Sequence, residues 1–190
     1  MTIRCPWAEK PEEMTLYHDR EWGVPVHDDT RHFEFLVLES AQAGLSWLTI
    51  LRKREGYRRL FAGFDPVQVA AFDEKRMEAL RQDPAIIRNK AKIKAAVNNA
   101  RAFLTIQEEY GSFDNYVWGF VDGTTIHNEW ESMETIPATS KDSENLAKDL
   151  KKRGFSFLGP TTVYAHMQAT GMVNDHLVSC FRYRELREGT

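Results

Sequence analysis

Two cysteine–histidine pairs lie at opposite ends of this 190-residue chain, and one site built from both would require the terminal segments to meet. Cys5 and His18 form the first pair, and His176 and Cys180 form the second. Zinc takes thiolate and imidazole ligands in a tetrahedral shell, and residues four apart on a helix share a face. The pattern therefore predicts a structural zinc site, because four protein ligands leave no open position for water.

The same two cysteines allow two other interpretations. They could be buried free thiols, or Cys5 and Cys180 could form a disulfide. Four residues so far apart in sequence do not decide between zinc and these alternatives by spacing alone. All three interpretations stay open at this point.

Length and composition predict a globular protein. With 190 residues and 42% hydrophobic content, the chain can bury a full core. We expect one domain over residues 1–190, in which two helical lobes could enclose a pocket. The sequence shows neither a signal peptide nor an apolar run long enough to cross a bilayer, and thiols in such a chain are typical of the cytoplasm. We therefore expect a cytoplasmic monomer with no membrane partner.

The distribution of charge is more informative than its sum. A net charge of −3 argues against a protein that coats nucleic acid through a global positive field. Basic residues nevertheless gather at residues 52–54, 88–94 and 151–153. Each such run is more often a solvated helix end. A local basic face for nucleic acid remains compatible with the sequence.

Helical spacing of apolar residues dominates the chain and predicts an all-α fold. Helices are expected over residues 31–44, from Ser46 to Arg59, after Asp65-Pro66, over residues 86–110, from Ser140 or Asp142, and from Pro160. Residues 123–139 contain turn residues and little periodicity, so they predict a loop that crosses between lobes. Few segments alternate with a period of two, as strands would.

Glu39 lies inside the most apolar of the expected helices. Its neighbours one turn away are Phe35, Leu36 and Ala43, so its carboxylate would be partly desolvated. Carboxylates are rarely buried unless a partner compensates for the lost hydration. Glu39 is therefore either an ion-paired structural residue or a functional residue.

Aromatic residues gather in two places that could form a pocket. Trp7, Tyr17 and Trp22 surround the N-terminal cysteine–histidine pair in the sequence, and Trp47 follows the turn that contains Gly44 and Leu45. Rings held beside a rigid site could bind a planar ligand. The alternative is a small aromatic core next to an ordinary turn between helices.

A second glycine-containing turn separates the last two expected helices. Here basic residues end one helix, glycines follow, and a proline starts the next helix: Lys152, Arg153, Gly154, Gly159, Pro160 and Thr161. Glycine lets a phosphate approach backbone N–H groups, and a helix start adds partial positive charge. The turn predicts either a helix-hairpin-helix that grips the DNA backbone without reading sequence, or a plain connection.

Five motifs, taken in order, resemble the DNA-3-methyladenine glycosylase I family. They are Arg4-Cys5-Pro6-Trp7, the block from Tyr17 to Pro25, Leu38-Glu39 with Ala43 to Trp47, Lys152 to Phe155, and Val173 to His176. Together they span nearly the whole chain. The resemblance implies an all-α helix-hairpin-helix glycosylase with a zinc site that joins the N- and C-terminal segments.

The resemblance also implies a role for individual residues. The ligands of Zn²⁺ would be Cys5, His18, His176 and Cys180. The base would bind in a pocket formed by Tyr17, Trp47, Trp7, Trp22 and Met14. The residues that contact DNA would be Gly44, Leu45, Lys152, Arg153, Gly154, Gly159 and Thr161. Glu39 would be the catalytic residue, and Leu45 would fill the gap left by a flipped nucleotide. The family often has an aromatic residue at Met14, so we expect an altered affinity there. Asp175 is expected to be structural and to orient His176.

The implied reaction is hydrolysis of the N-glycosidic bond of 3-methyladenine in alkylated double-stranded DNA, a step of base excision repair. Methylation at N3 gives the base a positive charge and weakens this bond, so the main task is to flip the base and stack electron-rich rings on it. Glu39 would stabilise the positive charge that develops on the sugar. The products would be free 3-methyladenine and an abasic site.

Two other classes of protein share parts of this pattern. A non-catalytic, zinc-containing helix-hairpin-helix module would bind DNA but would have no use for Glu39 facing aromatic rings. A hydrolase of free nucleosides would need the pocket, but Leu45 and the basic turn would have no role in it. Salt-sensitive binding to duplex DNA would argue against the nucleoside hydrolase.

Overall fold

The computed structural model describes residues 2–189, which are mostly helical. The α-helices are α1 (Glu12–Arg20), α2 (Asp29–Gln42), α3 (Trp47–Leu60), α4 (Pro66–Ala70), α5 (Glu74–Gln82), α6 (Lys90–Tyr110), α7 (Phe113–Trp118), α8 (Lys141–Lys152), α9 (Pro160–Ala169) and α10 (Phe181–Glu188). Four 3₁₀ helices are η1 (Pro6–Ala8), η2 (Ala62–Phe64), η3 (Gly119–Val121) and η4 (Met133–Thr135). None of the helices within residues 2–189 is long and apolar enough to span a membrane.

The structure also contains one pair of very short strands, which the all-α prediction did not include. Strand β1 (Ile126–His127) runs parallel to β2 (Val173–Asn174). Strand β1 lies in the segment 123–139, which is otherwise mostly loop, as predicted. The pairing attaches this loop to the C-terminal part of the chain, next to α9.

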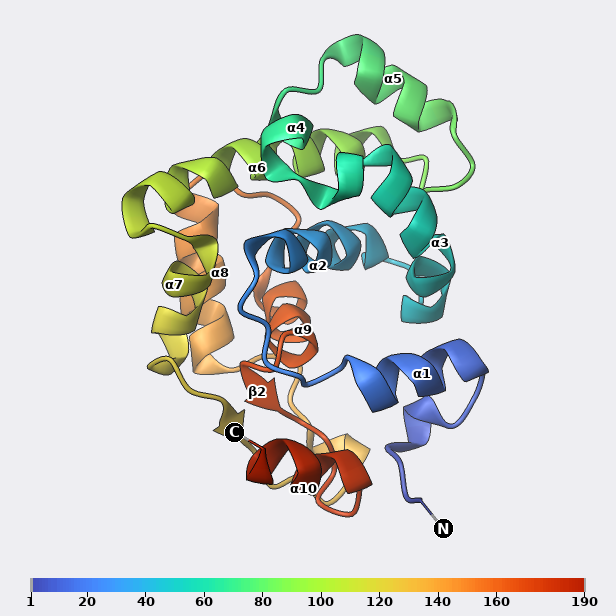
Figure 1. The fold of residues 1–190 in the computed structure, drawn as a ribbon, viewed down its shortest axis with the longest axis vertical. Helices are drawn as coiled ribbons and strands as arrows, with labels where there is room; N and C mark the ends of the chain where they lie inside the picture. Colours follow the sequence, from blue (N-terminus) through green and yellow to red (C-terminus); the bar gives the residue numbers. More distant parts are fainter. Residues whose placement is uncertain (1, 190) are drawn as a thin grey trace.

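Helix α2 lies near the middle of the molecule, with α6 above it, α3 to its right and α9 below it in Figure 1. Asp28 caps its start by accepting a hydrogen bond from the backbone N–H of Arg31. Ten of the fourteen residues of α2 are buried. A helix that is apolar on most sides must be enclosed in this way, and the enclosure takes Glu39 out of water.

The apolar spacing predicted that helix α6 begins at Ile86, but it begins at Lys90. Asn89 accepts a hydrogen bond from the backbone N–H of Lys92 and so caps the helix at this point. The helix ends before Gly111, as predicted, and Gly111 has a φ of 82°, which favours glycine. The side-chain cap therefore decides the boundary where apolar spacing alone does not.

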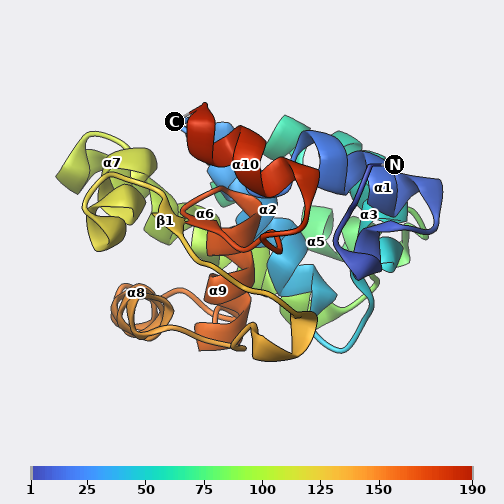
Figure 2. The ribbon, with the colours of Figure 1, turned by 90° about the horizontal axis from the view of Figure 1, so that it is seen from below.

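The turn between α8 and α9 spans residues 153–159 and brings the two helices into contact (Figure 2). Gly154 has a φ of 93°. Phe155 and Leu158 are buried in the main core and hold the turn in place. The predicted helices therefore exist on both sides of the turn, and α9 runs from it towards the centre of the molecule.

The N-terminal segment and α10 meet, as a shared site would require. The backbone N–H of Phe181 donates a hydrogen bond to the carbonyl of Ile3, with an N–O distance of 3.0 Å. His176 and Cys180, however, do not lie on a helix, which corrects the basis on which their spacing was interpreted. A turn before α10, closed by the N–H of Cys180 and the carbonyl of Leu177 at 2.8 Å, brings them together instead.

Candidate functional site

A cavity of about 260 Å³ opens between η1, α1, α2, α3 and α9. The six residues predicted to bind the base or act on it all line this cavity: Trp7, Met14, Tyr17, Trp22, Glu39 and Trp47. Five further lining residues were not predicted: Gln42, Met133, Ile136, Ala165 and Gln168. The size and the apolar lining with a few polar groups are typical of a site for a small planar molecule.

The aromatic rings of the cavity pack against one another at fixed angles. The ring centroids of Tyr17 and Trp47 are 5.4 Å apart, and Trp7 meets Trp22 edge to face at 5.0 Å. Burial, and after it the charge of Glu39, raises the pKa of Tyr17 well above its usual value, so its hydroxyl stays protonated. These contacts hold the rings still before any ligand arrives.

Trp47 also offers an unused hydrogen-bond donor. Its Nε1 atom is buried and has no acceptor among the described residues. A buried donor without a partner is costly, so most such groups in native proteins are paired. A ligand with an acceptor atom at this position would remove that cost.

Glu39 is buried without a compensating partner. Its side chain is 5% exposed, and within residues 2–189 its carboxylate makes no hydrogen bond or ion pair. Burial raises the pKa of Glu39 to about 8. The ion-paired alternative for this residue is therefore wrong, and a functional role fits its environment better.

The ion-paired carboxylate of α2 is Glu34 instead. It accepts hydrogen bonds at 2.8 Å from Arg54 and at 2.8 Å from Arg58. Burial alone would raise the pKa of Glu34, but the arginines outweigh it and lower the pKa. Arg54 also donates to Glu21, just after α1, so this network fixes α1 against α2 and α3 and with them the walls of the cavity.

We predict that Glu39→Gln stabilises the protein increasingly as pH rises from about 4.5 to about 8. The folded state keeps the proton of Glu39 up to a pKa of about 8, whereas an exposed glutamate releases it near 4.5. Between these values the folded state binds more protons than the unfolded state, so the contribution of Glu39 to the free energy of unfolding falls as pH rises. Glutamine has no such loss, so the gain in the free energy of unfolding should reach on the order of 5 kcal/mol.

Urea unfolding at pH 5, 7 and 9 measures this effect. Glu108→Gln is the matched control, because Glu108 is exposed and its replacement should change stability little at any pH. A stability difference for Glu39→Gln that does not vary with pH would show that water or a counter-charge reaches Glu39.

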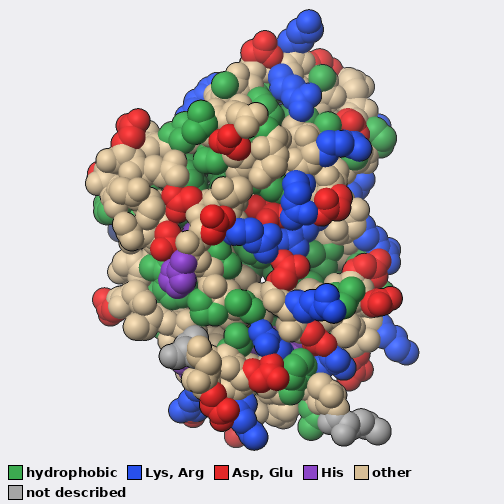
Figure 3. Space-filling view, viewed as in Figure 1, with side chains coloured by type: hydrophobic (Ala, Val, Ile, Leu, Met, Phe, Trp, Pro, Cys, Tyr) green, Lys and Arg blue, Asp and Glu red, His purple; other side chains and the backbone are tan. Residues whose placement is uncertain are grey.

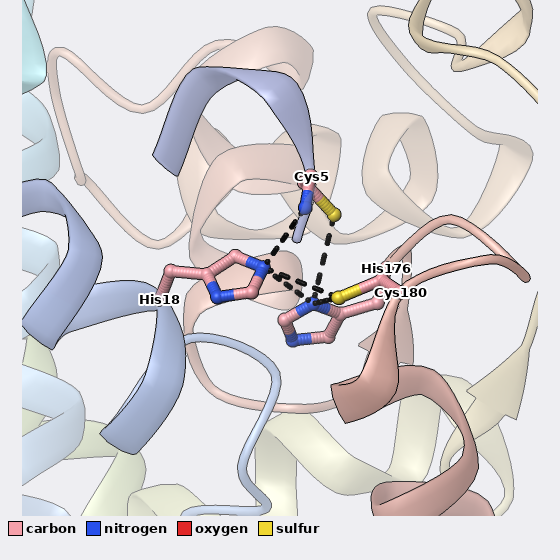
Figure 4. Close-up of side chains that lie close together, drawn as sticks. All are labelled: Cys5, His18, His176 and Cys180. Atoms are coloured by element: carbon pink, nitrogen blue, oxygen red, sulfur yellow. Dashed lines mark hydrogen bonds between the residues drawn. The ribbon is translucent and has the colours of Figure 1, made fainter. Parts of the chain in front are cut away.

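Cys5, His18, His176 and Cys180 converge in a buried cluster next to this cavity (Figure 4). Nε2 of His18 lies 3.2 Å from Nδ1 of His176 and 3.4 Å from Sγ of Cys180. Nδ1 of His176 lies 3.7 Å from Sγ of Cys5 and 3.6 Å from Sγ of Cys180. Ligand atoms around a tetrahedral zinc with ordinary bond lengths are separated by about 3.3–3.8 Å, so these residues fit a zinc ion.

Both cysteines are free thiols, so the disulfide alternative is not realised. The pKa of Cys180 is lowered, first by a hydrogen bond from the Cys5 thiol and then, against the effect of burial, by the two histidines. A thiolate is the form that binds a metal ion. The same hydrogen bond, together with burial, raises the pKa of Cys5, so without an ion the pair holds one thiolate, on Cys180, and one thiol, on Cys5.

Each histidine of the cluster turns one ring nitrogen inward because the other has its own partner. Nδ1 of His18 lies 2.7 Å from a carboxylate oxygen of Asp19, and Nε2 of His176 lies 2.9 Å from the carbonyl oxygen of Trp22. A ring that donates at one nitrogen offers a lone pair at the other. Arg4 in turn donates to Asp19 at 2.8 Å, so the orienting carboxylate is itself held in place.

Asp175 is structural, as predicted, but its carboxylate does not orient His176. Its carboxylate is buried and accepts four hydrogen bonds, from Asn128, Trp130, Tyr164 and Gln168. The donors come from the loop 123–139 and from α9, and each of the two carboxylate oxygens accepts two of the four hydrogen bonds. Asp175 therefore attaches this loop to α9, and through Gln168 it touches the wall of the cavity.

A second cavity of about 240 Å³ adjoins the first along the turn between α2 and α3. Glu39 and Gln42 line both cavities, and Gly44, Leu45 and Thr161 line only the second. Leu45 is 40% exposed. In Figure 2 the turn and the start of α9 lie on the same lower edge of the molecule, so three of the predicted DNA contacts share one surface.

Arg153 has intramolecular partners that compete with its predicted contact with DNA. Its guanidinium donates to Asp149 at 2.7 Å, to Glu109 at 2.5 Å and to the hydroxyl of Tyr110 at 2.8 Å. These partners raise the pKa of Arg153 and use its donors to join α6 to α8. A phosphate contact would have to break this network.

The other residues of the turn after α8 remain open to solvent. Lys152, Gly154 and Gly159 are exposed, and no atom lies within 4 Å of the point where a Cβ would stand at either glycine. On the face shown in Figure 3, Lys and Arg side chains are interspersed with Asp and Glu. This face therefore shows no continuous positive field, and a nucleic acid would have to bind to a local surface.

Comparison with known proteins gives consistent matches along the chain. Residues 7–183 match the family described as methyladenine glycosylase. The chain is 47% identical over 180 residues to DNA-3-methyladenine glycosylase 1 of Escherichia coli (strain K12), covering 95% of this chain and 96% of that protein.

Two solved structures are similar to the whole fold. A crystal structure of 3-methyladenine DNA glycosylase I matches with a TM-score of 0.92 and 47% identity, covering 94% of this chain and 98% of the other. A Staphylococcus aureus 3-methyladenine DNA glycosylase I, studied for its recognition of 3-methyladenine, matches with a TM-score of 0.91 and 38% identity, covering 94% and 95% of the two chains.

Proposed function

This chain belongs to the methyladenine glycosylase family, and we propose that it excises 3-methyladenine from alkylated double-stranded DNA. The family confirms the resemblance seen in the sequence motifs. The observation that carries the function is Glu39, a buried carboxylate without a partner in a cavity lined by aromatic rings. Such a cavity lacks a positive charge, and 3-methyladenine in DNA carries one.

Selectivity follows from this charge. The faces of Trp47 and Tyr17 attract a cationic base by on the order of 2 kcal/mol when the site is dry, and unmodified adenine lacks that contribution. The bound cation also supplies the counter-charge that Glu39 lacks in the empty cavity, so base binding favours the ionised carboxylate. Glu39 can then accept hydrogen bonds from the amino edge of the base.

The bond to the base breaks without a strong acid at the base. The electron pair of the N-glycosidic bond moves onto the purine, which leaves as neutral 3-methyladenine. The ionised Glu39 stabilises the positive charge that develops on the sugar. The oxygen of a water molecule then forms the new bond to the anomeric carbon, and this water releases one proton to the solvent. The DNA product is an abasic site.

DNA would approach along the second cavity. Leu45 would occupy the gap that the flipped nucleotide leaves in the duplex, which helps to offset the unstacking cost of a few kcal/mol. We propose that α8 and α9 act as a helix-hairpin-helix whose exposed Lys152, Gly154, Gly159 and Thr161 meet the DNA backbone. The open space around both glycines supports this assignment.

The cysteine–histidine cluster is proposed as a structural Zn²⁺ site. Thiolates with imidazoles are a ligand set that zinc prefers, and the spacing of the four ligand atoms suits it. The bound ion would cross-link the N-terminal segment to the segment before α10. Cysteines that form no disulfide also suit a reducing compartment, which supports the proposed cytoplasmic location.

Base release from methylated duplex DNA tests the proposed function. We expect the protein to release 3-methyladenine, identified by chromatography, well above the spontaneous loss in a reaction without protein. A folded protein that binds duplex DNA but releases no base would instead be a non-catalytic module. Release from free nucleosides alone would indicate a nucleoside hydrolase.

A further inference from the structure

The turn that carries Leu45 is held by an ammonium group from another helix. Lys92, in the first turn of α6, donates hydrogen bonds from Nζ to the carbonyl of Ala41 at 2.8 Å and to the carbonyl of Ala43 at 2.6 Å. These carbonyls lie at the C-terminal end of α2, where the helix itself provides no further N–H donors. Lys92 therefore supplies the hydrogen bonds that the end of α2 lacks.

The surroundings of Lys92 strengthen these bonds. Its side chain is half-buried and borders a narrow apolar gap with Tyr57 and Phe61. Burial lowers the pKa of Lys92, because water solvates its ammonium less well there. A positive charge also interacts favourably with the partial negative charge at the end of a helix. Two carbonyl oxygens thus replace part of the hydration of this ammonium.

The turn itself is short and leaves Leu45 exposed. Gly44 has a φ of 78°, and the N–H of Leu45 donates to the carbonyl of Gln42 at 2.6 Å. Ser46 follows at once as the cap of α3 and accepts from the N–H of Thr49. The α3 side of the turn is therefore fixed by Ser46, and the α2 side is fixed by Lys92.

We propose that Lys92 is a positioning residue for base flipping, which fixes the end of α2 so that Leu45 stands ready to enter the duplex. This inference rests on the proposed glycosylase function. A wedge on a loose turn would lose conformational freedom when it inserts into DNA, and a turn fixed beforehand avoids much of that loss. Lys92 does not line the base cavity, and its printed hydrogen bonds go to the backbone at the end of α2, so it acts through the turn.

Lys92→Met tests this role, because methionine keeps much of the aliphatic stem and removes the donors. We expect kcat/KM for excision from duplex DNA to fall about tenfold, which corresponds to about 1.4 kcal/mol. The affinity for free 3-methyladenine should stay within about twofold, since the wedge has no part in binding a free base. Lys94→Met is the matched control: Lys94 is exposed on the same helix, and its replacement removes the same charge.

A double-mutant cycle with Leu45→Ala shows whether Lys92 acts through the wedge. In the Leu45→Ala background, Lys92→Met should reduce kcat/KM by less than about twofold, because residues that act as one unit are not additive. Independent losses that multiply would overturn the proposal. So would a parallel loss of affinity for free 3-methyladenine, or an equal loss in Lys94→Met. If the unsubstituted protein released no base, the glycosylase function itself would fail.

Discussion

Glu39→Gln is expected to slow excision of 3-methyladenine from duplex DNA by about 10²- to 10³-fold, the usual effect of removing one preorganised electrostatic contact from a transition state. Glutamine has nearly the same shape as glutamate but cannot carry the negative charge that balances the developing sugar cation. Binding to DNA that contains an abasic analogue should change by less than about threefold, since that complex has no base in the cavity. Single-turnover rates and fluorescence anisotropy measure the two quantities.

The stability of the same variant separates catalysis from folding. Burial without a partner makes Glu39 destabilising once it is ionised, so Glu39→Gln should be more stable than the unsubstituted protein at pH 8 and above, yet far less active. A variant that gains stability and loses activity cannot owe its defect to misfolding. Equal losses of excision and of binding to the abasic analogue would contradict the catalytic assignment and make Glu39 a residue of the fold.

Much of the fold could be predicted from the sequence, because its helices carry clear local signals. The apolar faces and the side-chain caps of α2, α3 and α8 mark these helices. Boundaries were less certain where apolar spacing continued past a cap, as at Asn89. The spacing of His176 and Cys180 predicts a helix, but a turn produces the same separation, and sequence spacing does not distinguish the two.

The cavity could be predicted only in part. The aromatic residues near Cys5 and the acid on α2 were found because they lie in short recognisable motifs. Gln42 stands one turn after Glu39, which is a signal that helical geometry could have provided. Met133 and Ile136 come from a loop without periodicity, and their approach depends on the hydrogen bonds that Asp175 makes across the fold. Such long-range contacts leave no local pattern.

The sequence also does not show which acid orients a histidine of the cysteine–histidine cluster. Asp175 precedes His176 in sequence, yet its carboxylate faces four other donors, and Asp19 is the acid that orients the ring of His18. Asp19 is also adjacent to a proposed ligand, although only Asp175 was predicted to orient one, so adjacency alone does not identify the orienting acid. Only the three-dimensional arrangement distinguishes them. The zinc-binding proposal rests on how four buried ligand atoms converge. Removal of the metal ion is therefore its most direct test.

Removal of the metal is expected to lower the stability of the protein far more than its rate of catalysis. The cluster joins the N-terminal segment to the segment before α10, and the free energy of binding a structural zinc contributes directly to folding. A loss of several kcal/mol corresponds to a fall in Tm of about 10 °C for a domain of this size. Thermal unfolding after chelation, and again after Zn²⁺ is restored, measures the effect.

Activity of the metal-free protein, measured at a temperature where it is still folded, completes this test. The four protein ligands leave no position for a reacting water, and Glu39 is not one of them, so the single-turnover rate of excision should stay within about threefold. His18 follows Tyr17 in α1, and His176 contacts the carbonyl of Trp22, so a moderate rise in KM is consistent with looser cavity walls. A folded, metal-free protein with no excision at all would show that the ion takes part in the chemistry.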